Sequence, residues 1–243
     1  METLIIDTPT IKTAKQLLID TPVPEKTSTY KPVSHKQLMD ITLESLDKCG
    51  FILDKELYSA ARDGQQANGK YHLKYGNDPD MGLMIAWQNS YDKKLSLKFA
   101  VGSHVFICEN GMVVGDMGTL NMKHVGQIQE ITPTSLREAV CRAGDRFDHM
   151  ILQKNRMKEI EVTKKVSAEL LGRMFIDDGI ITSTQLSIIK NEIKKPTYDY
   201  EADGTVYQLY NHVTHALKTC PPQHWMTQQI AAHSFYTREF NIN

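Results

Sequence analysis

Residues 85–116 constrain the fold most, because they carry an almost unbroken series of strand and turn signals. Residues 95–108 alternate imperfectly between apolar and polar side chains, and Gly102 marks a bulge or bend. Asn110-Gly111 is the strongest hairpin signal in the chain, since Gly111 tolerates the positive φ that such a turn needs. We therefore predict an antiparallel sheet with Asn110 and Gly111 at a hairpin tip.

Helical patterns lie on both sides of the predicted strands. Ser34 is a suitable N-cap for a helix over residues 34–49. A longer amphipathic helix is predicted over residues 135–158, with Ser135 and Glu138 as its capping box. The apolar face that we expect to pack on the sheet consists of Leu136, Val140, Phe147 and Ile151.

Strands grouped together and helices grouped apart predict the α+β class, an antiparallel β-sheet with a long helix packed on one face. The other face of such a sheet would stay available to a partner. We divide the chain into an extended N-terminal arm (1–33), an α+β core (34–162) and a helical C-terminal portion packed on that core (163–243). The arm is rich in proline, although residues 11–20 have the pattern of one short helix. We expect residues 1–30 to add little to the monomer core and to lie along a neighbouring subunit, which predicts self-association.

Charge and cysteine content limit the partners and the compartment. Lys plus Arg number 28 and Asp plus Glu number 29, so nucleic-acid binding would need a local basic patch. The N-terminus lacks a signal-peptide pattern, and no segment approaches the ~18 apolar residues of a membrane helix. We therefore expect a cytoplasmic protein without membrane contact, in which the cysteines are free thiols. The cysteines are Cys49, Cys108, Cys141 and Cys220.

Enzymatic chemistry has weak support in this sequence. His212 and His215 are three residues apart on a predicted helix, but two ligands are too few for a metal site. Asp78 and Asp80 fit a turn in which an aspartate accepts hydrogen bonds from nearby backbone. The glycines do not match a phosphate-binding fingerprint, and no nucleophile stands out. We expect no enzyme activity, no cofactor and no metal.

Aromatic and basic residues interleave along the central strands, which suggests a nucleic-acid site. Aromatic faces stack bases and cations follow phosphates, so such a sheet can hold single strands without reading their sequence. The candidate residues are Tyr71, Lys74, Trp87, Tyr91, Lys93, Lys94 and Lys98. The alternative follows from strand alternation, which places Trp87 on the same face as Leu83 and Ile85. The rings would then belong to the core, and the lysines would only solvate the other face.

Five short strings give the chain a resemblance to a known family. They are KPVSH (31–35), QNSYDKK (88–94), CENGM (108–112), KH (123–124) and YNHVTHAL (210–217). In their order, over residues 31–218, they resemble a family of phage- and plasmid-encoded proteins described as a domain of unknown function. Gln88 stands where the family pattern has an arginine, and Glu109 replaces a small residue. The order of helix, hairpin, strands and long helix also resembles phage single-strand annealing proteins, by architecture alone.

The resemblance implies a mobile-element protein that works in the bacterial host cytoplasm. Together with the aromatic and basic residues, it predicts a non-enzymatic, oligomeric protein that binds single-stranded nucleic acid, with annealing or protection of strands as its role. Two alternatives stay open. One is an anti-defence protein that binds a host protein or a signalling nucleotide, and the other is a virion or structural assembly protein.

Overall fold

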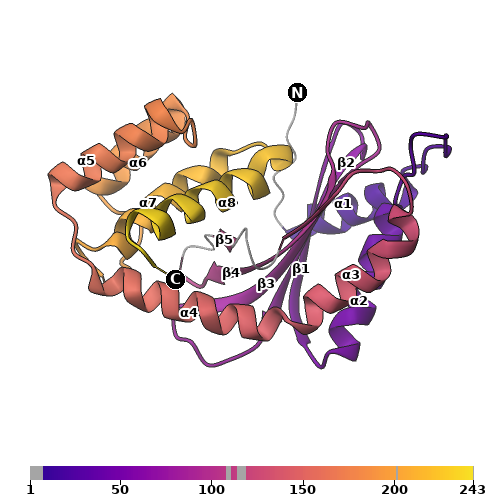
Figure 1. Ribbon diagram of the computed structural model, residues 1–243, viewed down its shortest axis with the longest axis horizontal. Helices are drawn as coiled ribbons and strands as arrows, with labels where there is room; N and C mark the ends of the chain where they lie inside the picture. Colours follow the sequence, from indigo (N-terminus) through magenta and orange to yellow (C-terminus); the bar gives the residue numbers. More distant parts are fainter. Residues whose placement is uncertain (1–7, 108–110, 114–118, 201, 243) are drawn as a thin grey trace.

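The computed structural model describes residues 8–107, 111–113, 119–200 and 202–242 (Figure 1). The described residues form a six-stranded antiparallel sheet surrounded by helices, which confirms the α+β class. The strands are β1 (Ile52–Ala61), β2 (Gln66–Lys74), β3 (Met81–Ser90), β4 (Leu97–Val105), β5 (Gly111–Val113) and β6 (Thr119–Met122). The helices are α1 (Thr8–Asp20), α2 (His35–Lys48), α3 (Ile128–Cys141), α4 (Ala143–Glu159), α5 (Lys164–Gly172), α6 (Ser183–Lys194), α7 (Val206–Ala216) and α8 (Pro222–Glu239), with a π-helix η1 (Arg173–Asp177) and a 3₁₀ turn η2 (Leu217–Thr219).

The sheet is a meander from β1 to β4, followed by two short strands that share one neighbour. β5 pairs with the end of β4 near His104, and β6 pairs with its beginning near Leu97. Asn110 lies outside the described residues, so the predicted hairpin tip is not tested. β5 begins at Gly111, as a return strand after that turn would.

One face of the sheet packs on α2, α3 and α4 and holds the main hydrophobic core. The predicted cap of α2 is confirmed, because the Ser34 side chain accepts a hydrogen bond from the backbone N–H of Gln37. The predicted long helix is instead two helices, which meet at Arg142. Ser135 lies inside α3, so the predicted capping box is wrong. α3 begins seven residues earlier, at Ile128, and tolerates Pro133 in its interior.

The buried face of these two helices agrees with the prediction. Leu136, Val140 and Phe147 are at most 1% exposed, and Ile151 is half-buried against the same cluster. α4 runs along β3 and β4, so its apolar side chains fill the space under the centre of the sheet. Helical spacing in the sequence therefore identified the core side of this segment correctly, although it missed the break between the helices.

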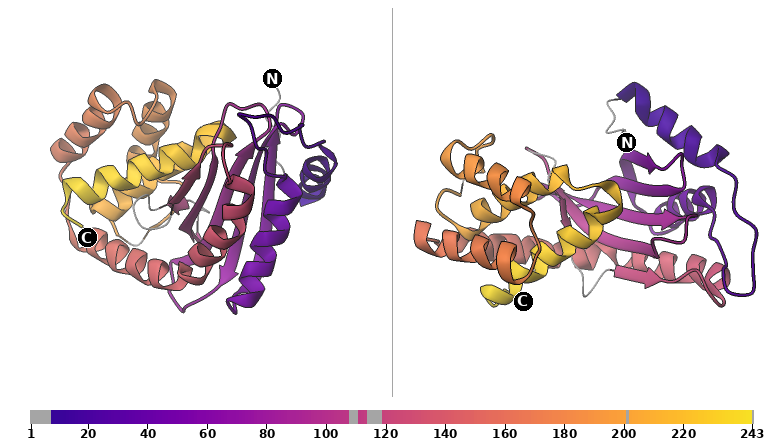
Figure 2. Two further views of the ribbon diagram at one scale, coloured as in Figure 1. Left: turned by 45° about the vertical axis from the view of Figure 1, so that its right-hand side comes forward. Right: turned by 90° about the horizontal axis from the view of Figure 1, so that it is seen from above.

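The second face of the sheet is covered by α8, as the left view of Figure 2 shows. Met226 on α8 packs with Met84, Ala86 and Ala100 in a second, smaller hydrophobic cluster. The expectation of a face left open for a partner is therefore wrong where α8 crosses β2 and β5. The side chains of β3 point alternately to two covered faces, which explains why every residue of this strand is buried.

The N-terminal segment differs from the predicted arm. α1 packs on β1, and Ala14, Leu18 and Tyr30 are at most 5% exposed within the single chain. Lys15 also forms an ion pair with Glu56 of β1 at 2.5 Å. The expectation that residues 1–30 add little to the monomer core is therefore wrong. The apolar spacing of one short helix was enough to give this segment a buried side.

Two cysteines that lie far apart in the sequence form a disulfide. Cys49 follows α2 and Cys141 ends α3, and the packing of these helices brings their Cα atoms to 5.2 Å. The expectation of free thiols is therefore wrong for this pair, because 92 residues of separation hide a contact that tertiary packing creates. Cys220 is a free thiol, and Cys108 lies outside the described residues.

Candidate functional site

The three aromatic rings of the predicted nucleic-acid site lie in the core. Trp87 and Tyr71 are 0% exposed, and Tyr91 is 3% exposed. The indole N–H of Trp87 donates to the Tyr71 hydroxyl at 3.1 Å, so both polar atoms find partners inside the protein. Rings in this position cannot stack bases. The structure shows the part of the alternative that concerns the rings, which belong to the core.

The four predicted lysines are spread over separate places. Lys74 lies 3.6 Å from Asp54 at one end of β2, and the Lys98 ammonium donates to the Thr227 hydroxyl of α8 at 2.5 Å. Burial lowers the pKa of Lys98. Only Lys93 and Lys94 are neighbours, exposed in the turn after β3, with Lys93 above the Tyr30 ring. The seven predicted residues therefore do not share one exposed face.

Two strings of the family resemblance meet around the buried imidazole of His35. Its Nε2 lies 3.0 Å from the Gly64 carbonyl, and its Nδ1 lies 3.0 Å from the Asn89 amide nitrogen. The ring stacks on Tyr91 with 3.8 Å between centroids. Because the carbonyl can only accept and the amide nitrogen can only donate, Nε2 carries the proton and Nδ1 accepts. The ring is neutral, and burial lowers its pKa to about 4.

The KH string joins the same end of the sheet. The backbone N–H of Lys31 donates to the His124 carbonyl at 2.7 Å, and the His124 ring lies beside Tyr30. Tyr30, His35 and His124 are each at most 6% exposed. These strings therefore attach the segment before α2 to the end of the sheet.

The paired carboxylates form a buried ion network. Asp78 accepts hydrogen bonds from the backbone N–H groups of Asp80 and Met81, which confirms the predicted turn. The buried Lys154 ammonium lies 2.6 Å from Asp78 and 2.7 Å from Asp80, and Lys158 also contacts Asp80. Full pairing satisfies these buried charges and ties α4 to the β2–β3 connection.

The two helical histidines surround one buried carboxylate. His212 and His215 each lie 3.8 Å from Glu192, which also accepts hydrogen bonds from Thr197. Burial is the largest cause of the lowered pKa of both imidazoles. Among the described residues, no group of three histidine, cysteine or carboxylate side chains is placed to hold a metal.

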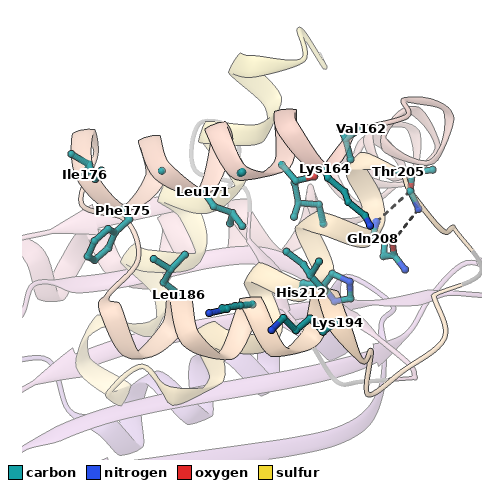
Figure 3. Close-up of a pocket in the computed structure, with 17 residues that line it drawn as sticks. Val162, Lys164, Leu171, Phe175, Ile176, Leu186, Lys194, Thr205, Gln208 and His212 are labelled. Carbon is teal, nitrogen blue, oxygen red and sulfur yellow. Dashed lines mark hydrogen bonds between the residues drawn. The ribbon is translucent and has the colours of Figure 1, made fainter.

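An apolar groove of about 660 Å³ opens in the C-terminal helical portion, which the sequence did not indicate as a site. Its walls are α5 with η1 on one side and α6 on the other, with the start of α7 as its floor (Figure 3). The apolar lining residues are Val162, Ala168, Leu171, Phe175, Ile176, Leu186, Ile193 and Leu209. Ile176 is 76% exposed, and Phe175 and Ile193 are also exposed. Clustered exposure of large apolar side chains is typical of a binding surface.

The charged residues that line the groove have one sign. Lys164, Lys190 and Lys194 are all exposed, and the lining includes no carboxylate. Lys164 and Lys194 lie toward the same end as Gln208 and His212, whereas Phe175 and Ile176 lie at the other end (Figure 3). Within the described part of the chain, none of the three lysines forms an ion pair. The groove is therefore lined by apolar side chains along its length, and two of its three lysines lie at one end.

The sequence contained one signal for this groove. Apolar residues in the string LLGRMFIDDGII continue beyond the face that a single helix would bury, and they repeat on the next helix at Leu186 and Ile193. Whether such residues meet across a groove depends on how far apart two helices are held. That distance depends on how the helices pack in the folded chain, where α6 packs on α7, and periodicity does not report it.

Comparison with known proteins identifies the family. The family described as Domain of unknown function (DUF932) matches residues 25–231. The chain belongs to this family. The DUF932 match includes all five resemblance strings and the whole groove lining, and it confirms the resemblance seen in the sequence. It gives no support to the likeness with annealing proteins. Neither the search of curated proteins nor the search of solved structures found a match to the DUF932 chain.

The hydropathy of the DUF932 helices bears on membrane insertion. Over the described residues, no helix combines the length and the apolar character that crossing a bilayer requires.

Proposed function

We propose that this DUF932 protein is a non-enzymatic binding protein, and that its partner is another protein held in the groove between α5–η1 and α6. The observation that carries the proposal is the exposure of Phe175, Ile176 and Ile193 around one apolar groove. Burial of such side chains against a partner is favourable by about 25 cal/mol per Å² of apolar surface removed from water. Exposed apolar side chains lower the solubility of a protein, so their clustering around one groove favours a role in recognition.

The choice of a protein partner over single-stranded nucleic acid rests on the aromatic rings. Tyr71, Trp87 and Tyr91 are buried, so the predicted stacking surface is missing from the folded chain. The resemblance to phage- and plasmid-encoded proteins supports a mobile-element role in a bacterial host. There a host defence protein is the partner class that we favour, and assembly of a virion is the alternative.

Ile176→Glu should weaken partner binding at least about tenfold without lowering stability. Its side chain is 76% exposed, so the fold does not depend on it, whereas a carboxylate facing an apolar partner loses hydration. The tagged wild-type and variant proteins would be used to capture partners from the bacterial host. The partner lost by the variant would then be purified, and its affinity for both proteins measured by calorimetry.

Leu152→Glu is the matched control for this experiment. Leu152 is 64% exposed on α4, outside the groove lining, so the same change in charge and size occurs elsewhere on the surface. We expect the control to bind as the wild-type does. Equal loss of binding in both variants, or no loss in either, would show that the groove is not the binding surface.

Single-stranded oligonucleotides should bind weakly at physiological salt, if they bind at all. Only Lys93 and Lys94 form an exposed cationic pair among the predicted residues, and two phosphate contacts change the log–log salt slope by only about 1.4. A fluorescence titration with a labelled oligonucleotide measures this. Micromolar affinity that falls steeply with salt and is lost in a Lys93→Ala/Lys94→Ala variant would return the function to nucleic-acid binding.

A further inference from the structure

Gly172, in the wall of the groove, is a glycine that the protein's own fold does not require. It ends α5 with ordinary helical dihedral angles, φ −60° and ψ −46°. A Cβ atom built on it would meet nothing within 4 Å. Glycine inside a helix is destabilising relative to alanine, so a residue with a side chain would stabilise α5 here. What glycine provides at this position is room for something outside the chain to approach the helix closely.

A second small residue extends the surface on which another chain could approach α5 closely. Ala168 precedes Gly172 by one helical turn and also lines the groove. Larger side chains flank these two small residues. Leu171 and Phe175 lie one turn apart on the α5–η1 wall, and Leu186 lies on the facing wall, α6. The groove therefore has small residues on one wall and larger apolar residues at helical spacing on both walls. This shape fits an amphipathic helix, which inserts apolar anchors at positions i, i+4 and i+7.

The charges of the groove select among such helices. Lys164 and Lys194 lie at one end of the groove, and neither is paired within the described residues. Carboxylates on the polar edges of a bound helix would come close to these ammonium groups. A helix with basic edges would meet charges of its own sign, so the lysines discriminate against it as well as attract its acidic counterpart.

We propose that the groove binds an amphipathic α-helix of a partner protein whose apolar face is flanked by acidic residues. This inference rests on the proposed function and names the kind of partner that the groove takes. Gly172 and Ala168 allow the helix to approach closely, Leu171, Phe175 and Leu186 receive its apolar side chains, and the lysine end pairs with its carboxylates.

Three labelled peptides of about four helical turns test the proposal against the full-length protein. The first carries leucine at i, i+4 and i+7 with glutamate elsewhere on its flanks. The second replaces every glutamate with lysine, and the third has the composition of the first in an order that scatters the leucines. Fluorescence anisotropy should show the first peptide binding at least about tenfold more tightly than either of the others.

Gly172→Trp should weaken binding of the first peptide at least about tenfold, because it adds a large ring to the groove lining at a point where a Cβ atom meets no other atom within 4 Å. Thermal unfolding would confirm that the variant folds, and Gly172→Gln serves if it does not. Leu152→Trp adds the same bulk outside the groove and should leave binding unchanged. Lys164→Glu with Lys194→Glu should reverse the preference, so that the basic peptide binds more tightly than the acidic one.

The outcomes separate this inference from the proposed function. Equal binding of the ordered and scattered peptides, or a preference unaltered by charge reversal, would overturn the acidic helix as the occupant. The groove would still be a binding surface if Ile176→Glu abolishes capture of a cellular partner. If neither the peptides nor cellular partners respond to changes in the groove, both proposals are wrong.

Discussion

Lowering the pH from 6.5 to 5 should destabilise this protein by about 4–5 kcal/mol through three buried histidines. Burial lowers the pKa of His35 and His233 to about 4 and that of His72 to about 3, against 6.5 in the unfolded chain. Below pH 6.5 the unfolded chain therefore binds protons that the folded chain does not. Stability is complete above pH 6.5 and is lost as the pH falls toward the folded pKa values.

The local contacts explain why each ring resists protonation. The His35 Nδ1 accepts a hydrogen bond from the amide N–H of Asn89, so a proton on Nδ1 would repel that N–H group. The His233 Nε2 donates to Gln153, and its Nδ1 is buried without a hydrogen-bond partner. His72 stacks on His104 with 3.8 Å between ring centroids, where a positive charge would also be buried.

Urea unfolding followed by tryptophan fluorescence at pH 8, 6.5, 5.8 and 5 would measure this loss. The window above pH 5 separates histidines from carboxylates such as Asp80, whose lowered pKa affects stability only in more acidic solution. His233→Gln should remove about one third of the loss that His35, His72 and His233 cause together, because it deletes one of their three protons. A free energy of unfolding that stays constant from pH 6.5 to 5 would contradict the prediction.

Removing the disulfide between Cys49 and Cys141 should lower the free energy of unfolding by about 4–5 kcal/mol. The bond closes a loop across 92 residues of sequence, so it excludes many conformations from the unfolded chain. Both cysteines lie near the surface, and their replacement by serine leaves the packing of α2 and α3 largely intact. Urea unfolding of the oxidised wild-type and of Cys49→Ser/Cys141→Ser at pH 8 would compare the two.

Cys220→Ser is the control, since Cys220 is a free thiol. It should leave the free energy of unfolding close to that of the wild-type. Dithiothreitol should bring the wild-type to the stability of the double variant and should not affect the double variant itself. Stability that does not respond to dithiothreitol would mean that the bond adds nothing in solution.

The sequence by itself determined the fold class and much of the core. Alternation along β3 and β4 and the helical spacing of Leu136, Val140 and Phe147 are local patterns, and local patterns report which face of an element is apolar. The same alternation also contained the correct placement of Trp87. The family followed from five short strings, and three of them hold the segment before α2 to the sheet.

Only the tertiary structure decided which distant segments of the chain pack against one another. Three sets of contacts join segments that are distant in the sequence. They are the disulfide between Cys49 and Cys141, the packing of α8 on the second face of the sheet, and the hydrogen bonds of His35. The groove depends in the same way on the spacing between α5 and α6, which the tertiary structure sets. Periodicity reports the apolar side of one element, whereas a site forms from the distance and orientation between several, and only the folded chain defines these.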